Sequence, residues 1–386
     1  MIKRLFPYNL LLFYILFYSG QAVYGGYISL YLDSVGFSKT QIGMFTSVAT
    51  IAVLLTQFFW GYATDRSKKM NTILSLLLIL SSGSILGFYL GTGMAFVMIV
   101  MSLFCVFYNP IPALMDSLTL ETLDERKSKL NFGHIRLGGT LGYAMGVFFA
   151  GQLMNNEYRK MFYMISILFF LAFLTLMFIS PTEVMRKISK EYSFKALIQN
   201  KRIFCFLFLQ LIFALGMTIF YNYYPLYFTS IGGTSSLLGT MLFATAISEI
   251  PFWFISGRLI GRFGYERMMA ISVCVVGLRW LVLFLTKNLY IAILVNMTHG
   301  FSFVTLNYSL VTYIDSNVPK ELRATGQTMI AMLSTIFSRV IGGLFIGFFS
   351  DIFGIDRILL FAFVLSYVSV AVFFLLVKML KPTRPA

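Results

Sequence analysis

The sequence has little charge and few histidines or cysteines. Only 12% of its 386 residues are charged, compared with about 25% in a typical soluble protein. Two histidines, no nucleotide-binding Walker motif and no nucleophile–base spacing argue against an enzyme or a nucleotide-driven pump. The three cysteines lie in apolar runs and are interpreted as small core residues rather than disulfide partners. We therefore expect no enzymatic activity, no cofactor and no metal.

Hydrophobic residues, in contrast, make up 58% of the chain, 42 of its residues are phenylalanine, and the mean hydropathy is +0.82. So little polar surface cannot cover a protein in water, and the expected solvent is a bilayer. Apolar runs of about 20 residues indicate membrane-spanning helices, and the alternation typical of barrel strands does not appear. The sequence predicts an all-α membrane protein with twelve spans, at residues 8–32, 40–63, 70–90, 94–120, 134–155, 160–180, 203–229, 236–259, 267–286, 289–314, 324–349 and 357–379.

Basic residues predict the orientation of these spans. If both termini are cytoplasmic, most of the 30 Lys and Arg residues fall in cytoplasmic loops, and Arg136, Arg279 and Arg339 fall inside spans. The net charge of +15 then lies beside the membrane, which favours anionic lipid headgroups over nucleic acid as a partner. We expect cytoplasmic termini, contact with the lipid bilayer and no nucleic-acid binding.

The chain repeats itself at an offset of 196 residues. Residues 30–43 read LYLDSVGFSKTQIG, and residues 226–239 read LYFTSIGGTSSLLG, with five identities and no gap. The sequence therefore predicts a six-helix bundle over residues 1–180, a basic cytoplasmic linker over 181–202 and a second six-helix bundle over 203–386.

A second offset, of 90 residues, is nested within each half. It relates Gly61 to Gly151 and Gly257 to Gly347. Each half is interpreted as two three-helix units of opposite orientation, an organisation typical of secondary transporters. The alternative is that short apolar helices with glycine near their ends resemble each other without a common origin.

One motif carries a family resemblance. Residues 61–69 read GYATDRSKK, which resembles the loop signature of the major facilitator superfamily, and residues 257–267 repeat it as GRLIGRFGYER with Gly261 in place of the acid. The resemblance covers the whole chain and implies that Gly61, Asp65 and Arg66 take part in gating. The alternative is a helix end followed by charges that only set topology.

Other segments resemble the proton-symporter branch of lactose, nucleoside and phenylpropionate permeases. These are FGHIRLGGTLGY at residues 132–143, VPKELRATGQTM at 318–329 and the His-Gly pair at 299–300. The branch carries charged residues on five particular spans, and this chain has charged or ionisable residues on the same spans, although Ser302 and Phe303 stand where lactose permease has a glutamate. The resemblance implies that Asp116 and Arg136 bind substrate and that Glu249, Arg279 and His299 couple protons.

Ionisable groups inside a membrane are costly, which favours a functional role for them. Each nevertheless has a structural alternative: Asp116 with Arg136 as a structural ion pair, Arg279 as a neutralising partner of Glu249, and His299 as a packed core residue. Arg339 is interpreted either as an anion-binding residue or as a partner of Asp315.

Aromatic and amide side chains add four candidate substrate ligands: Tyr18, Gln21, Asn222 and Tyr224. They suit a sugar, a nucleoside or an aromatic acid, although aromatic filling between helices explains them equally well. The sequence predicts a proton-coupled symporter of a small polar solute, acting as a monomer in the plasma membrane of a bacterium. The alternative is a proton-coupled drug or metabolite exporter. Exporters of the superfamily that this chain resembles carry a motif rich in glycine and proline late in the fifth span. The fifth span here has Gly138, Gly142 and Gly146 but no proline, which disfavours export.

Overall fold

The computed structural model describes residues 7–67, 70–126, 131–179, 201–318 and 320–380, and every regular element in these ranges is helical. The chain divides into two compact units. Unit 1 comprises Met1–Ile188 and Gly233–Phe243, and unit 2 comprises Ser189–Gly232 and Ala244–Ala386. Most of the predicted linker over residues 181–202 lies outside the described residues.

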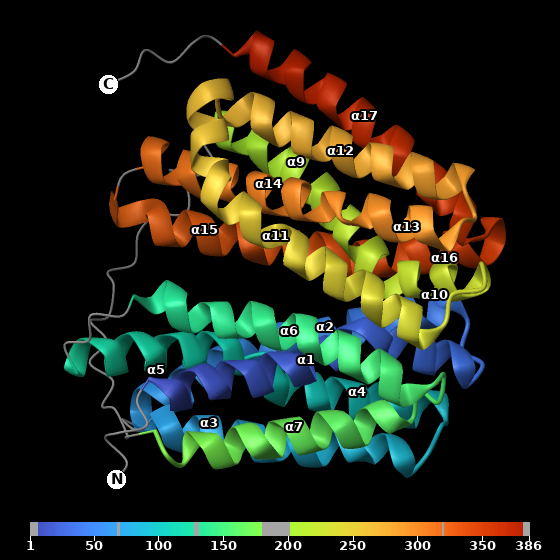
Figure 1. Ribbon diagram of the computed structural model, residues 1–386. Helices are drawn as coiled ribbons and strands as arrows, with labels where there is room; N and C mark the ends of the chain where they lie inside the picture. The colour runs from blue at the N-terminus through green and yellow to red at the C-terminus, as the bar shows by residue number, and fades with distance from the viewer. Residues whose placement is uncertain (1–6, 68–69, 127–130, 180–200, 319, 381–386) are drawn as a thin grey trace. The chain divides into compact units, whose positions relative to one another are not determined.

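In unit 1, α1 lies against both α6 and α7, and α3 packs on α4 and α7 (Figure 1). The elements are α1 (Tyr8–Ser34), α2 (Lys39–Ser67), α3 (Met70–Ile85), the 3-10 turn η2 (Leu86–Tyr89), α4 (Met94–Tyr108), α5 (Ile111–Glu125), α6 (Phe132–Met154) and α7 (Lys160–Leu176).

In unit 2, α12 packs against α14 and α17, and α9 contacts α17 and η4. The elements are α9 (Lys201–Thr218), the π-helical η3 (Ile219–Tyr223), α10 (Tyr224–Ser230), α11 (Ser235–Phe263), α12 (Tyr265–Leu285), α13 (Leu289–Asn296), α14 (Thr298–Asn317), α15 (Lys320–Thr335), the π-helical η4 (Ile336–Gly342), α16 (Gly343–Phe353) and α17 (Ile355–Met379). The first residues of α11, up to Phe243, belong to unit 1.

Glycines spaced four residues apart on α6 bring its backbone against that of α1. A Cβ atom at Gly142 would lie 2.7 Å from Cα of Ile15, and one at Gly146 would lie 2.6 Å from Cα of Ser19. The Ser19 hydroxyl also donates a 2.8 Å hydrogen bond to the carbonyl of Gly142. Small residues allow this close approach, which is how helices associate in lipid.

The structure reproduces the 196-residue repeat in detail. Gly36 and Gly232, which correspond in the two halves, both adopt the left-handed conformation, with φ of 98° and 95°. The hydroxyl of Tyr27 donates to the carbonyl of Val147 at 2.8 Å, and Tyr223 donates to Gly343 at 2.5 Å. The two donors, Tyr27 and Tyr223, are 196 residues apart, and so are the two acceptors, Val147 and Gly343. The repeat therefore preserves a tertiary hydrogen bond as well as residue identities.

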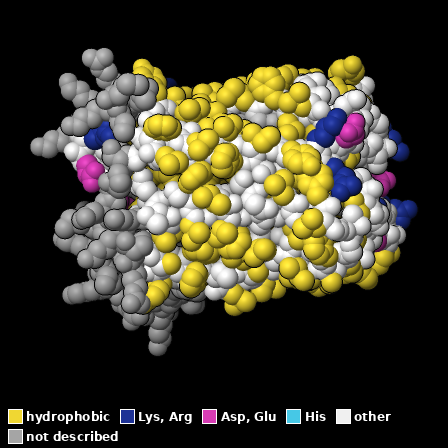
Figure 2. All heavy atoms as spheres, turned by 90° about the horizontal axis from the view of Figure 1, so that it is seen from below, with side chains coloured by type: hydrophobic (Ala, Val, Ile, Leu, Met, Phe, Trp, Pro, Cys, Tyr) yellow, Lys and Arg dark blue, Asp and Glu magenta, His cyan; other side chains and the backbone are white. Residues whose placement is uncertain are grey.

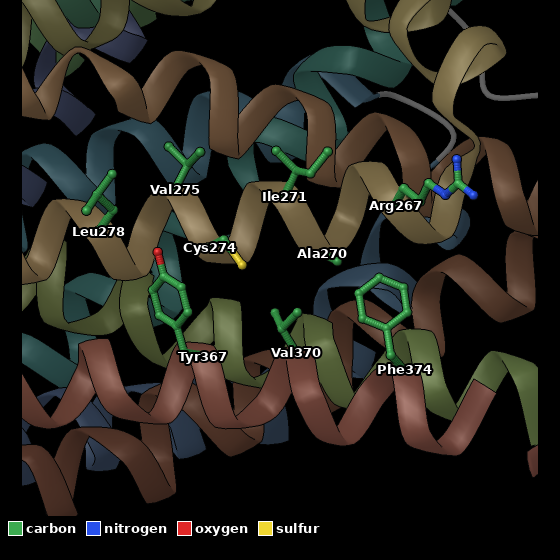
Figure 3. Close-up of a pocket in the computed structure, with 9 residues that line it drawn as sticks. All are labelled: Arg267, Ala270, Ile271, Cys274, Val275, Leu278, Tyr367, Val370 and Phe374. Carbon is green, nitrogen blue, oxygen red and sulfur yellow. The ribbon is translucent and has the colours of Figure 1, made fainter. Parts of the chain in front are cut away.

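The nested offset of 90 residues is visible in two turns of unit 2. Gly264 precedes α12 and Gly354 precedes α17, with φ and ψ of 82° and 158° in the first and 86° and 152° in the second. The residues around them read FGYER and FGIDR. The same turn therefore begins two helices that run in opposite directions, since α12 and α17 pack antiparallel (Figure 3).

Within the described ranges, nine helical segments are long and apolar enough to cross a membrane. They cover nine of the twelve predicted spans; α7 is apolar but has only 17 residues. α1 and α6 are also absent from the nine, because their many tyrosine, serine and glycine residues lower the hydropathy of helices that pack on each other. In the view of Figure 2, hydrophobic side chains cover the middle of the surface and charged ones gather toward its ends. The count of twelve spans stays a prediction.

Candidate functional site

Two polar clusters lie inside the units, one in each. The first cluster, in unit 1, consists of Tyr14 and Tyr18 on α1, Asp116 and Thr119 on α5, and Arg136 on α6. The Tyr14 hydroxyl donates to Oδ1 of Asp116 at 2.6 Å, and the Thr119 hydroxyl donates to Tyr14 at 3.2 Å. Nε of Arg136 lies 3.9 Å from the same Oδ1. The structure thus brings together the two charged residues predicted on neighbouring spans.

Arg136 is also held by an aromatic ring. Its guanidinium carbon lies 4.5 Å from the centroid of the Tyr18 ring. A Cβ atom at Gly139 would lie 2.5 Å from Nη1 of Arg136 and 3.0 Å from the Tyr18 ring, so glycine is needed to admit this stack. The side chains of Arg136 and Asp116 remain 39% and 35% exposed. A solute can therefore reach both members of the ion pair.

Gln21 lies on α1, seven residues after Tyr14 and therefore on the same face. Its side-chain oxygen Oε1 is buried and has no hydrogen-bond partner among the described residues. An unsatisfied acceptor near the first cluster is consistent with a polar ligand or a water molecule.

The second cluster, in unit 2, is a chain of three ionisable side chains: Arg279 on α12, His299 on α14 and Glu249 on α11. Nη1 of Arg279 lies 3.1 Å from Nδ1 of His299, and Nε2 of His299 lies 3.7 Å from Oε1 of Glu249. His299 therefore stands between the arginine and the carboxylate. The sequence suggests that Arg279 neutralises Glu249 directly. The structure instead places His299 between them, in contact with both.

The chemistry of arginine fixes the tautomer of His299. Every guanidinium nitrogen carries hydrogen and none can accept, so Nδ1 of His299 must be the acceptor of the 3.1 Å contact. In this arrangement the imidazole is neutral, and its proton is on Nε2, facing Glu249. A second proton on Nδ1 would point at Arg279 and break that contact.

Aromatic rings enclose this cluster. The His299 ring is stacked between Phe220 and Phe303, with centroid distances of 4.9 and 5.2 Å. The guanidinium of Arg279 lies 5.1 Å from the Phe220 ring and 4.6 Å from the Trp280 ring. Arg279 and His299 are each only 1% exposed. Electrostatic interactions are strong in such surroundings because little water screens them.

Arg279 has unused hydrogen-bonding capacity. Within the described part of the chain, its Nε and Nη2 atoms have no hydrogen-bond partner. These two buried nitrogens carry three N–H donors, and buried donors without acceptors are costly. They give the second cluster the means to bind an acceptor group of a solute or of a water molecule.

The π-helical segment η3 places further predicted residues beside this cluster. Phe220 of this segment stacks on the His299 ring, and Tyr221 follows it in the chain and is half-buried. The neighbouring Asn222 is half-buried. Tyr224 is fully buried, and its hydroxyl accepts a 2.8 Å hydrogen bond from Asn296, so it also holds α10 against α13.

The residues of the signature motif lie at the end of α2, which continues through Ser67. Gly61, Asp65 and Arg66 are thus helical rather than in a loop, and their side chains are outside the described part of the structure, so their gating role stays a prediction. No group of three or more potential metal ligands occurs within residues 7–67, 70–126, 131–179, 201–318 and 320–380.

Comparison with known proteins identifies the family. Residues 8–376 match the model of the MFS_1 like family. The chain belongs to this family. Among the relatives of this major facilitator superfamily transporter are the maltose permease of Geobacillus stearothermophilus, 26% identical over 97% of this chain and 95% of the relative, and a probable 3-phenylpropionic acid transporter of Escherichia coli strain K12, 22% identical over 80% and 82%. The family consists of transporters, so this major facilitator protein is a permease and not an enzyme.

Solved structures confirm the fold. The crystal structure of the nucleoside transporter NupG matches with a TM-score of 0.85 over 96% of this chain and 99% of that chain, at 17% sequence identity. Such a likeness at low identity shows the fold of the superfamily.

Several residues in or beside the two clusters were not expected from the sequence. Thr119, Phe220, Phe303 and Asn296 carry no charge, and one side chain of this kind is indistinguishable from the many others in apolar helices. The irregularity at η3 had a signal in Pro225, which lacks the N–H that would bond to the carbonyl four residues earlier. π-helical turns of this kind occur frequently at functional sites.

Proposed function

We propose that this transporter is a proton-coupled symporter of a small polar organic solute, a sugar, a nucleoside or an aromatic acid. It works by alternating access as a monomer with twelve spans and cytoplasmic termini in the bacterial plasma membrane. The proposal rests above all on the second cluster, in which a neutral histidine links a permanent cation to a carboxylate. The names of the relatives, a maltose permease and a phenylpropionic acid transporter, support the choice of solutes.

The second cluster is the proposed proton site. A proton arriving at Glu249 neutralises the carboxylate and weakens its attraction for the Nε2–H of His299. The positive charge of Arg279 is then less balanced, and its Nε and Nη2 atoms, which have no hydrogen-bond partner among the described residues, favour an acceptor group. Coupling follows because the solute binds better to the protonated state, and linkage makes that preference reciprocal.

The first cluster is the proposed solute site. Arg136 presents a rigid, planar set of donors, and Asp116 accepts hydrogen bonds. A donor fork next to an acceptor suits the vicinal hydroxyls of a sugar or a ribose. The ring of Tyr18 lies beneath Arg136 and holds the guanidinium in the site.

A flux assay tests the proposal. Proteoliposomes would contain the purified protein and an internal pH-sensitive dye, and maltose, a nucleoside and 3-phenylpropionate would be added outside. We expect one of these solutes to acidify the lumen as it enters. Solute entry without acidification would contradict proton symport, and solute-dependent proton movement in the opposite direction would favour the exporter.

A further inference from the structure

A groove on unit 2 is lined by none of the residues of the two polar clusters. It runs between α12 and α17 and has a volume of about 490 Å³ (Figure 3). Its lining is almost entirely apolar: Ala270, Ile271, Cys274, Val275 and Leu278 from α12, and Tyr367, Val370 and Phe374 from α17. Arg267 is the one charged residue that lines it, at the end where α12 begins.

The groove has the length of one lipid chain. From Arg267 to Leu278 it follows eleven residues of α12, or about 16 Å at the helical rise. One leaflet of the hydrocarbon core is about 15 Å thick, half of the usual 30 Å. Both helices are apolar enough to cross the membrane, so the groove extends from the interface to near the midplane.

Positive charge is concentrated at the interfacial end. Lys378 follows Phe374 by four residues on α17, which places it one turn further toward the same end and on the same face. Arg267 and Lys378 are both exposed. Glu266 adjoins Arg267 but points about 100° around the helix from it. Two cations at the interfacial end of an apolar groove complement a lipid phosphate with its acyl chain in the groove.

We propose that this groove binds an anionic glycerophospholipid, with its phosphate at Arg267 and Lys378 and one acyl chain along the α12–α17 groove. The surrounding bilayer is as apolar as the groove, so the chain fits the groove without adding a hydrophobic driving force. Selectivity therefore comes from the headgroup. With the orientation proposed above, this is the cytoplasmic leaflet, where anionic lipids attract basic residues beside a span.

Native mass spectrometry of the full-length protein tests this proposal independently of transport. The protein would be titrated in detergent with phosphatidylglycerol or phosphatidylcholine of equal chain length. We expect tighter binding of phosphatidylglycerol, and Arg267→Gln should weaken it about fivefold, the effect of roughly one basic side chain at an anionic surface. Val370→Trp, which fills the floor of the groove and keeps its charge, should remove the bound lipid.

The repeated turn provides a matched control. Arg357 occupies the position equivalent to Arg267 in the second FG-x-acid-Arg turn, at the opposite end of the helix pair, and does not line the groove. Arg357→Gln should leave lipid binding unchanged. Equal losses in the two variants, or equal binding of the two lipids, would overturn the proposal.

Cys274 offers a second measurement in the same molecule. It is half-buried in the groove, whereas Cys105 and Cys205 are buried. Phosphatidylglycerol in nanodiscs should slow the reaction of Cys274 with a membrane-permeable maleimide, compared with phosphatidylcholine nanodiscs. An unchanged rate would contradict preferential occupation of the groove by phosphatidylglycerol, even if the variants had altered folding.

Discussion

The guanidinium carbon of Arg136 lies 4.5 Å from the centroid of the Tyr18 ring, while Nε of the same side chain lies 3.9 Å from Oδ1 of Asp116. The aromatic ring and the carboxylate both restrict the position of this side chain. Such preorganisation is valuable in a binding site, because the ordering of a long side chain is already complete before the solute arrives.

Arg136→Lys should weaken solute binding at least about tenfold, equivalent to ~1.4 kcal/mol, because an ammonium cannot present a planar fork. The measurement is the affinity of the purified protein for the solute identified in the flux assay. Arg159→Lys is the matched control, because Arg159 also lies over a tyrosine, Tyr89, at 5.2 Å. Near-normal affinity of Arg136→Lys would reduce the first cluster to a structural bridge.

Glu249→Gln should abolish uphill accumulation while solute counterflow continues, because the amide cannot carry a proton but the solute site is intact. Proteoliposomes with an imposed pH gradient provide the first reading, and exchange of labelled solute provides the second. Glu157→Gln, which alters an exposed ion pair with Lys160, should change neither. Continued uphill accumulation in Glu249→Gln would move the coupling role to His299.

His299→Phe should destabilise the fold by about 1.5–3 kcal/mol, because it removes the neutral acceptor that hydrogen-bonds the buried guanidinium of Arg279. The double variant His299→Phe/Arg279→Met should recover much of that loss, since an apolar pair of similar volume removes the unpaired charge. Thermal unfolding in detergent would measure both. Additive losses in the double variant would show that the two side chains are energetically independent.

Gly142→Ala should lower the stability of unit 1 by about 1–3 kcal/mol, the usual cost of overpacking, because the new methyl group would meet the Ile15 backbone. Gly25→Ala is the control: it is also a helical glycine, on α1, with nothing within 4 Å of the added carbon. The control should be neutral or stabilising, since alanine favours a helix by about 1 kcal/mol over glycine. Equal melting temperatures for the two variants would show that the α1–α6 contact tolerates a methyl group.

Periodicity and repetition revealed much of this fold from the sequence. The repeated segments, residues 30–43 and 226–239, contain Gly36 and Gly232 at equivalent positions. Both positions have a positive φ, which glycine adopts without strain, so the identity has a structural cause. The pairing of Asp116 with Arg136 was also accessible, since an intramembrane charge needs a partner and the two residues lie on consecutive spans.

Other features depend on tertiary contacts that no local pattern records. The position of His299 between Arg279 and Glu249 depends on how α11, α12 and α14 pack, and its ring is held by Phe220 from a fourth element. The apolar runs at residues 8–32 and 134–155 did predict α1 and α6, but not that these two helices pack on each other through their small and polar residues.

The two FG-x-acid-Arg turns at Gly264 and Gly354 also have an evolutionary consequence. A segment with an odd number of crossings reverses its direction when it is copied in tandem, which accounts for the same turn at opposite ends of the antiparallel helices α12 and α17. The same pattern of glycine, acid and arginine therefore begins helices of either direction.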